Sequence, residues 1–86
     1  MFEWDERKSK ECAELRGFDF SIVYEFDFET AMIVEDDRHD YGETRFKAFN
    51  TIGDKLYNVV FTVRGSRLRI ISVRRVRKRE GKRYGF

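Results

Sequence analysis

The sequence contains no proline, a single cysteine and no apolar run near the ~18 residues that a membrane-spanning helix needs. One cysteine excludes an internal disulfide, and turns without proline must rely on glycine, asparagine or aspartate. The N-terminus also lacks the charged and then apolar pattern of a secretion signal. These absences favour a reducing, cytoplasmic location with no membrane contact.

The composition is that of a folded chain. Of the 86 residues, 40% are charged, 41% are hydrophobic and nine are phenylalanine. This apolar share is too high for a disordered chain, because it is enough to offset the entropy cost of ordering. A chain of this length buries only roughly 60% of the surface that its unfolded state exposes. We therefore expect residues 1–86 to form one small domain with a thin core.

The net charge of +2 conceals a separation of the two signs along the chain. Residues 1–63 carry 8 Lys or Arg against 15 Asp or Glu, a net charge of −7. Residues 64–86 carry 10 against one, a net charge of +9, and eight of the ten are arginine. Such asymmetry indicates a polyanionic partner, and the planar guanidinium suits phosphate. The alternative is a solvated basic face.

Apolar spacing and capping residues predict two helices near the N-terminus. The first covers residues 5–16 and ends at Gly17, a residue typical of helix C-termini. A second, short helix would begin at Asp19 or Ser21, because either side chain can cap exposed backbone N–H groups. Its inward stripe would consist of Ile22, Val23 and Phe26.

Four strands follow. They cover residues 30–34, 45–50, 56–63 and 68–73, with an acidic loop at 35–40 and a hairpin turn at 64–66. The third strand is the strongest, and one of its faces carries Tyr57, Val59, Phe61 and Val63. Short connections imply antiparallel pairing, because parallel strands need long crossovers.

A final basic helix is predicted after Ser72, a candidate N-cap. On it, Val76, Glu80 and Tyr84 recur every four residues. The order of elements predicts an α+β fold with two N-terminal helices, a four-stranded antiparallel sheet and a C-terminal helix.

The sequence shows no metal-site pattern, phosphate-binding loop, dinucleotide motif or hydrolase triad. His39 lies in the acidic loop, where a solvated side chain is expected. Cys12 is expected to be a small, buried core residue.

The basic quarter does contain one candidate constellation. Its members are Arg64, Arg67, Arg69, Arg74, Glu80 and Tyr84. Arg67 and Arg69 are two residues apart on one strand, so they project from the same face, which they share with Ile71 and Val73. Arginines can hold a scissile phosphate, and a carboxylate can transfer a proton. RNA supplies its own 2′-hydroxyl nucleophile. For the carboxylate and the tyrosine, the alternatives are a salt bridge and a packed aromatic lid.

Several short motifs span nearly the whole chain. They are Phe2-Glu3-Trp4-Asp5 with Lys8, Gly17 with Phe20, Arg45-Phe46, the hairpin segments 61–65 and 69–74, and Glu80 with Tyr84. In this order and at these distances they resemble the BrnT family of type II toxins, ribonucleases with a RelE-like fold.

The resemblance implies an endoribonuclease that needs no metal or other cofactor, cleaves RNA and inhibits translation. It also implies a BrnA-like antitoxin whose ribbon-helix-helix region binds operator DNA, so that the toxin contacts DNA only through its partner. The residues assigned to catalysis are Arg64, Arg69, Arg74 and Glu80. The residues assigned to RNA binding are Arg67, Arg75, Lys78 and Tyr84. The alternative is a non-enzymatic RNA- or partner-binding module of the same fold.

The chain departs from the family pattern at three positions of the first helix. The family usually has asparagine at Cys12 and Lys-His at Leu15-Arg16. Because arginine stays protonated, Arg16 can supply a charged contact but not a general base.

Overall fold

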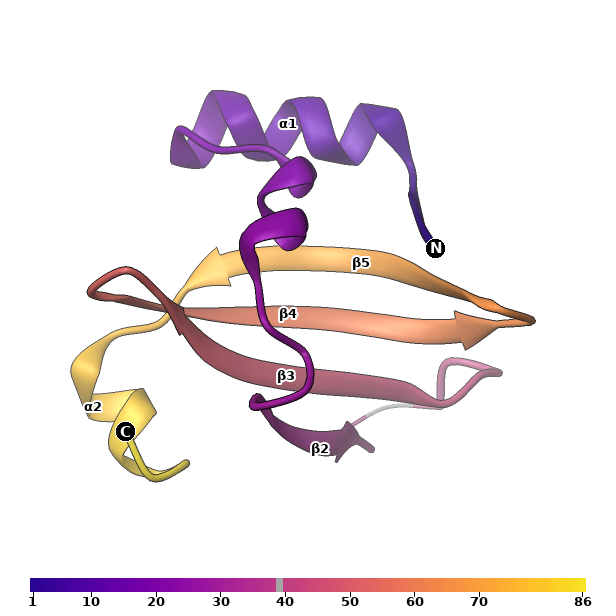
Figure 1. The fold of residues 1–86 in the computed structure, drawn as a ribbon. Helices are drawn as coiled ribbons and strands as arrows, with labels where there is room; N and C mark the ends of the chain where they lie inside the picture. The colour runs from indigo at the N-terminus through magenta and orange to yellow at the C-terminus, as the bar shows by residue number, and fades with distance from the viewer. Residues whose placement is uncertain (39) are drawn as a thin grey trace.

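The sheet pairs the first strand of the sequence with the last, while the two termini lie on opposite sides of the molecule (Figure 1). For the residues that it describes, 1–38 and 40–86, the computed structural model has a five-stranded sheet of order β1-β5-β4-β3-β2. The strands are β1 (Phe2–Trp4), β2 (Met32–Asp36), β3 (Arg45–Ile52), β4 (Lys55–Arg64) and β5 (Arg67–Arg75). The predicted α+β class is confirmed, and β2 to β5 pair antiparallel as expected. His39 and its predicted solvated position lie outside the described residues.

The strand β1 was not predicted, and it makes the sheet mixed rather than wholly antiparallel. It runs parallel to β5, with Phe2 opposite Leu68 and Trp4 opposite Ile70. The N–H of Leu68 also donates to the carbonyl oxygen of Met1, at 2.8 Å. Three residues are too few to show the alternation that marks a strand in sequence. The strand β1 therefore forms only because folding places β5 beside it.

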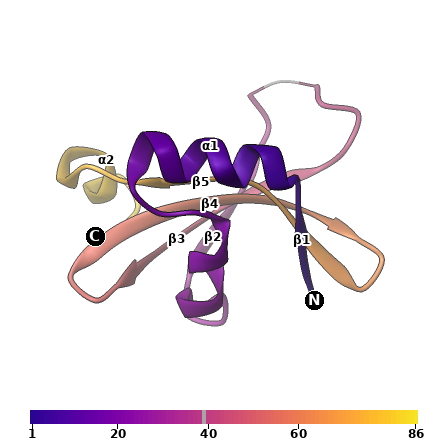
Figure 2. The same cartoon turned by 90° about the horizontal axis from the view of Figure 1, so that it is seen from above.

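One face of the sheet is covered by α1 and η1 (Figures 1 and 2). The helix α1 (Glu6–Arg16) is capped by the side chain of Asp5 and ends at Gly17, whose φ of 82° favours glycine. The segment η1 (Phe20–Glu25) is capped by Asp19, as predicted. It is a 3₁₀-helix rather than an α-helix.

The core lies between this helical layer and the sheet. Its buried side chains are Cys12, Phe20, Val23, Phe26, Ala48, Tyr57, Val59, Phe61, Ile70 and Val73. The register of β4 confirms that the four side chains predicted to share a face do so, and Tyr57, Val59 and Phe61 lie in the core. Val63 is 54% exposed because it lies beside the β4–β5 turn, beyond the core. The predicted burial of Cys12 is also confirmed.

A β-bulge in β5 changes which side chains face the core. Phe61 pairs with Ile70 and Val60 pairs with Ser72, so Ile71 is an extra residue without a partner in β4. An extra residue reverses the alternation beyond it. Ile70 and Val73 therefore both face the core, and the predicted placement of Val73 beside the arginines is wrong.

The start of the C-terminal helix was also predicted wrongly. Ser72 does not cap a helix but lies within β5, which continues to Arg75. The helix α2 (Lys78–Lys82) is one short turn that begins after Arg77 and has no side-chain cap. Burial of Val73 in the core favours the extended conformation over the helical one.

The edge strand β2 begins later than predicted and includes Asp36, which was assigned to a loop. Asp36 is 4% exposed. Arg38 donates to its two carboxylate oxygens from Nε at 2.8 Å and Nη2 at 2.9 Å. These hydrogen bonds lower the pKa of Asp36 from 3.8 to about 2. The stabilisation is therefore complete well above pH 4 and is lost as the pH falls toward 2.

We predict that Asp36→Asn lowers the free energy of unfolding by about 1–2 kcal/mol at pH 7, because it leaves Arg38 without its anionic partner. The difference from wild type should close between pH 4 and pH 2, as measured by urea unfolding. Asp37→Asn, at an exposed neighbouring residue, is the matched control. A difference that is equal at pH 7 and pH 2 would contradict the electrostatic explanation.

Candidate functional site

The face of the sheet opposite α1 and η1 carries basic side chains in rows across the strands. We call it the basic face, and its basic residues are Arg45, Lys47, Arg64, Arg67, Arg69 and Arg74. Pairing aligns Arg45, Thr62 and Arg69 in one row, and it aligns Phe49, Asn58 and Arg74 in another. The positions of the arginines on this face therefore follow from the sheet register, including the bulge that brings Arg74 to it.

At the hairpin end of the basic face, the arginines pair with carboxylates from the N-terminal half of the chain. Glu3 accepts from Arg69 Nη1 at 3.0 Å and lies 3.8 Å from Arg67 Nη1. Glu43 lies 3.6 Å from Arg64 Nη2. The charge separation of the sequence is thus partly cancelled in three dimensions. Arg64 and Arg67 have side chains more than half exposed, so their ion pairs contribute little stability.

At the opposite end, α2 and the residues after it place a second cluster on the basic face. Arg74 donates to both carboxylate oxygens of Glu80, at 3.1 and 2.6 Å. The ring of Tyr84 stacks on Phe49 with centroids 4.0 Å apart and planes at 18°. Lys47 Nζ lies 3.5 Å from the Tyr84 hydroxyl oxygen. This cluster therefore brings together a guanidinium, a carboxylate, a phenol and an ammonium group.

The carboxyl of Glu80 is held in its ionised form. Hydrogen bonds from Arg74 are the main cause that lowers its pKa, and the charges of Arg74, Arg83 and Lys47 act in the same direction. An ionised carboxylate that accepts two hydrogen bonds fixes the orientation of the guanidinium. The salt bridge considered as an alternative for Glu80 is present, and so is aromatic packing of Tyr84.

The structure thus divides the predicted site residues into two groups. Arg69 and Arg74 pair with Thr62 and Asn58, which are four residues apart in β4, so the two arginines are separated by roughly 13 Å at about 3.3 Å per residue. Arg74, Glu80 and Tyr84 come together, whereas Arg64 and Arg69 lie with Arg67 at the hairpin.

The two remaining predicted residues lie outside both groups. The guanidinium carbon of Arg75 lies 5.9 Å from the ring centroid of Tyr57, a core residue. Lys78 is exposed on α2 and has no ion pair within residues 1–38 and 40–86.

A cleft of about 590 Å³ adjoins the second cluster at the end of β5. Its lining residues are Arg16, Phe18, Arg74, Arg75, Arg77 and Glu80. Arg16, Phe18 and Arg77 were not assigned to a site from the sequence. For Arg16 the sequence offered one signal, the departure at Leu15-Arg16 from the pattern of the family that it resembles, and Gly17 marked where α1 ends.

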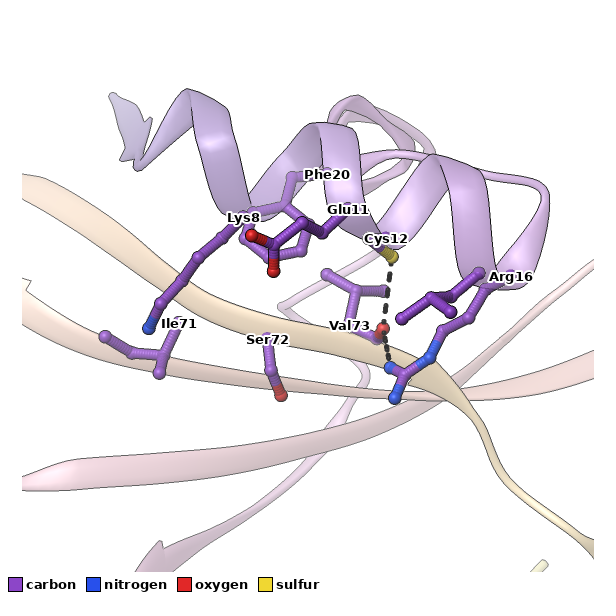
Figure 3. A pocket seen from close by; sticks show the side chains of 9 residues that line it. Lys8, Glu11, Cys12, Arg16, Phe20, Ile71, Ser72 and Val73 are labelled. Atoms are coloured by element: carbon purple, nitrogen blue, oxygen red, sulfur yellow. Dashed lines mark hydrogen bonds between the residues drawn. The ribbon is translucent and has the colours of Figure 1, made fainter.

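A second, smaller groove of about 270 Å³ lies between α1 and β5 (Figure 3). In it, Cys12 Sγ and Arg16 Nη1 both point to the carbonyl oxygen of Val73, at 3.6 and 2.8 Å. Burial raises the pKa of the Cys12 thiol, so the thiol is not activated as a nucleophile. The two hydrogen bonds to Val73 attach α1 to the sheet.

Residues 1–38 and 40–86 hold neither a metal-binding cluster nor a membrane-spanning helix. They contain no group of three or more His, Cys, Asp or Glu side chains that could hold a metal ion. No helix in this part of the chain has the length and apolar character needed to cross a bilayer.

Comparison with protein families identifies the chain. Residues 4–80 match the family described as "Ribonuclease toxin, BrnT, of type II toxin-antitoxin system". The chain belongs to the BrnT family. This toxin therefore has RNA as its target and an antitoxin as its partner. The match includes Arg74 and Glu80, whereas Tyr84 lies beyond it. A comparison with curated proteins gave no match.

We predict that Tyr84 stabilises the toxin through its ring rather than its hydroxyl. Tyr84→Ala should lower the free energy of unfolding by about 2 kcal/mol, because it removes the stack on buried Phe49. Tyr84→Phe keeps the ring and should stay within about 0.5 kcal/mol of wild type. Urea unfolding measures both values. Equal destabilisation by the two substitutions would contradict this assignment.

Proposed function

We propose that this toxin is a metal-independent endoribonuclease whose catalytic centre is the cluster of Arg74, Glu80, Tyr84 and Lys47. The observation that supports the proposal is the pairing of Arg74 with Glu80 by two hydrogen bonds, in a cleft that four arginines line. A guanidinium fixed in this way is ready to meet a phosphate without reorganising, which is the condition for effective electrostatic catalysis.

The proposed reaction is an internal transfer within RNA. The 2′-oxygen attacks the adjacent phosphorus, the bond from phosphorus to the 5′-oxygen breaks, and a 2′,3′-cyclic phosphate and a 5′-hydroxyl form. Arg74 stabilises the negative charge that develops on the phosphate oxygens. Glu80 orients Arg74 and accepts the proton of the 2′-hydroxyl through a remaining lone pair.

The leaving 5′-oxygen needs a proton. The Tyr84 hydroxyl is placed to donate it, because Lys47 Nζ lies beside the phenol oxygen and can in turn return a proton. The stack on Phe49 holds the phenol in position for this transfer.

Arg64 at the end of β4, and Arg67 and Arg69 at the start of β5, lie too far from Arg74 to share the scissile phosphate with it. We propose that they bind phosphates of flanking nucleotides, by exchanging Glu3 and Glu43 for the RNA backbone. Arg75, which lines the cleft, and Lys78, which is exposed on α2, are proposed to bind further RNA phosphates beyond the basic face.

The antitoxin is proposed to be BrnA-like and to cover the basic face, so that it competes with RNA. Its ribbon-helix-helix region would bind operator DNA, and the toxin would contact DNA only through it. Cleavage of RNA in the cytoplasm would inhibit translation. A second candidate function, a non-enzymatic binding module, is favoured by one observation: both Glu80 oxygens are already engaged by Arg74.

We predict that the purified toxin cleaves RNA in the presence of a chelator and leaves 2′,3′-cyclic phosphate ends. Arg74→Ala should lower the cleavage rate by about 10²–10³-fold, because it removes a charge-stabilising donor. Arg79→Ala, at an exposed position on α2, is the matched control and should stay within about threefold. Circular dichroism checks that both variants are folded.

Three outcomes would contradict parts of this proposal. An inactive wild type that still binds RNA supports the binding module instead. Loss of cutting on addition of chelator rules out the metal-independent mechanism. An Arg74→Ala variant as active as the control moves the catalytic centre elsewhere.

We also predict that the hairpin arginines control RNA affinity rather than chemistry. The affinity for single-stranded RNA should fall as salt rises, and each phosphate contact contributes about 0.7 to the slope of log affinity against log salt. Arg67→Ala should reduce this slope by about 0.7, the value of one contact. The rate of single-turnover cleavage at saturating toxin should stay close to that of wild type. An unchanged slope would mean that Arg67 stays paired with Glu3 in the complex.

A further inference from the structure

The cleft at the end of β5 brings together residues from distant parts of the chain. Arg16 and Phe18 come from the end of α1, Arg74 and Arg75 from β5, and Arg77 and Glu80 from the α2 segment. Figure 1 shows these three ends meeting at the same side of the molecule. The volume of about 590 Å³ is within the range of sites that bind small molecules. Four guanidinium groups line it against one carboxylate, which Arg74 already engages.

Arg16 lines both this cleft and the smaller groove between α1 and β5, where it is held without losing its charge. Its Nη1 donates to the carbonyl oxygen of Val73 at 2.8 Å (Figure 3). A guanidinium has five N–H donors, so most remain available to a ligand. The carbonyl is neutral, and the positive charge of Arg16 is therefore not cancelled as it is for Arg69 by Glu3.

The core residue Tyr57 positions an aromatic ring and a second guanidinium on the same side of the cleft. The ring of Phe18 packs edge to face with Tyr57, with centroids 5.4 Å apart and planes at 81°. The guanidinium of Arg75 lies over the same Tyr57 ring. Tyr57 is only 7% exposed, so it is a rigid support for both. Phe18 itself is half-buried and lines the cleft.

We propose that this cleft is a nucleotide subsite, in which Arg16, Arg75 and Arg77 hold a phosphate and Phe18 packs against the nucleobase. Unstacked bases bind to aromatic side chains, and guanidinium groups bind phosphate with charge-assisted hydrogen bonds. The carboxylates of an acidic peptide would pair with the arginines but would not stack on the ring, whereas a nucleotide joins a phosphate to a flat base that does, so the aromatic residue favours a nucleotide.

The subsite rests on the proposed function in one respect: the nucleotide it takes belongs to the RNA that is cut at Arg74. Because Arg74 and Glu80 line both the cleft and the catalytic cluster, the bound nucleotide lies next to the scissile phosphate. The subsite then selects the base beside the cut.

The first experiment measures binding of the four nucleoside 5′-monophosphates and of inorganic phosphate to the whole toxin, by NMR titration. We expect at least one nucleotide to bind about tenfold more tightly than phosphate. Phe18→Leu should remove that difference, and Arg77→Ala should weaken both ligands. Lys10→Ala, at an exposed position on α1, is the matched control. Arg77 is exposed, so its variant keeps the test valid if Phe18→Leu fails to fold.

The second experiment maps the cut sites in a random-sequence RNA pool. Wild type should prefer certain bases beside the cut, and Phe18→Leu should flatten that preference, whereas Lys10→Ala should not. The inference is overturned if nucleotide binding and cut-site preference are both independent of Phe18 and Arg77, even though RNA is cleaved. It is also overturned if oligoglutamate binds as tightly as the best nucleotide and equally well to Phe18→Leu.

The two proposals fail in different ways. Nucleotide binding that depends on Phe18, together with intact RNA, would support the subsite and reject the ribonuclease mechanism. Cleavage of RNA without any effect of Phe18→Leu would do the reverse.

Discussion

The arrangement of this toxin depends on one extra residue in β5. The bulge at Ile71 reverses the alternation of side chains, so Val73 enters the core and Arg74 reaches the basic face. Without it, Arg74 would share the face of Ile70 and point toward the helical layer. The hydrogen bonds between Arg74 and Glu80, and with them the proposed catalytic cluster, follow from this local irregularity.

The same stretch of β5 ties the core to the cleft. Buried Val73 offers its carbonyl oxygen to Cys12 and Arg16 on α1, which fixes the end of that helix beside the sheet. The ring of buried Tyr57 contacts both the ring of Phe18 and the guanidinium of Arg75. Side chains that serve the core on one side therefore position charged and aromatic groups on the other. In a domain with so thin a core, stability and the proposed nucleotide site depend on the same residues.

Much of the fold could be predicted from local patterns, and the failures have a common cause. The helix α1, between its caps Asp5 and Gly17, and the antiparallel strands show capping residues, turns and alternation that neighbouring residues determine. The strand β1, the bulge and the length of β5 depend on pairing and burial with distant residues, so a local pattern does not show them. The same holds for the site: Glu80 and Arg74 were predicted, but Arg16 and Phe18 enter the cleft only through packing of α1 on β5.

By itself the sequence determined the α+β class, the family and the concentration of arginine in the last quarter of the chain, because these depend on composition and on short motifs. Tertiary structure decided how much of that charge stays available. Two glutamates from the acidic part of the chain contact the hairpin arginines. Glu3 does so because β1 pairs with β5, and Glu43 does so because it lies just before β3. The arginines at the other end of β5 instead surround one cleft. Charge along a chain is fixed by its residues, whereas its cancellation depends on distance, which only folding sets.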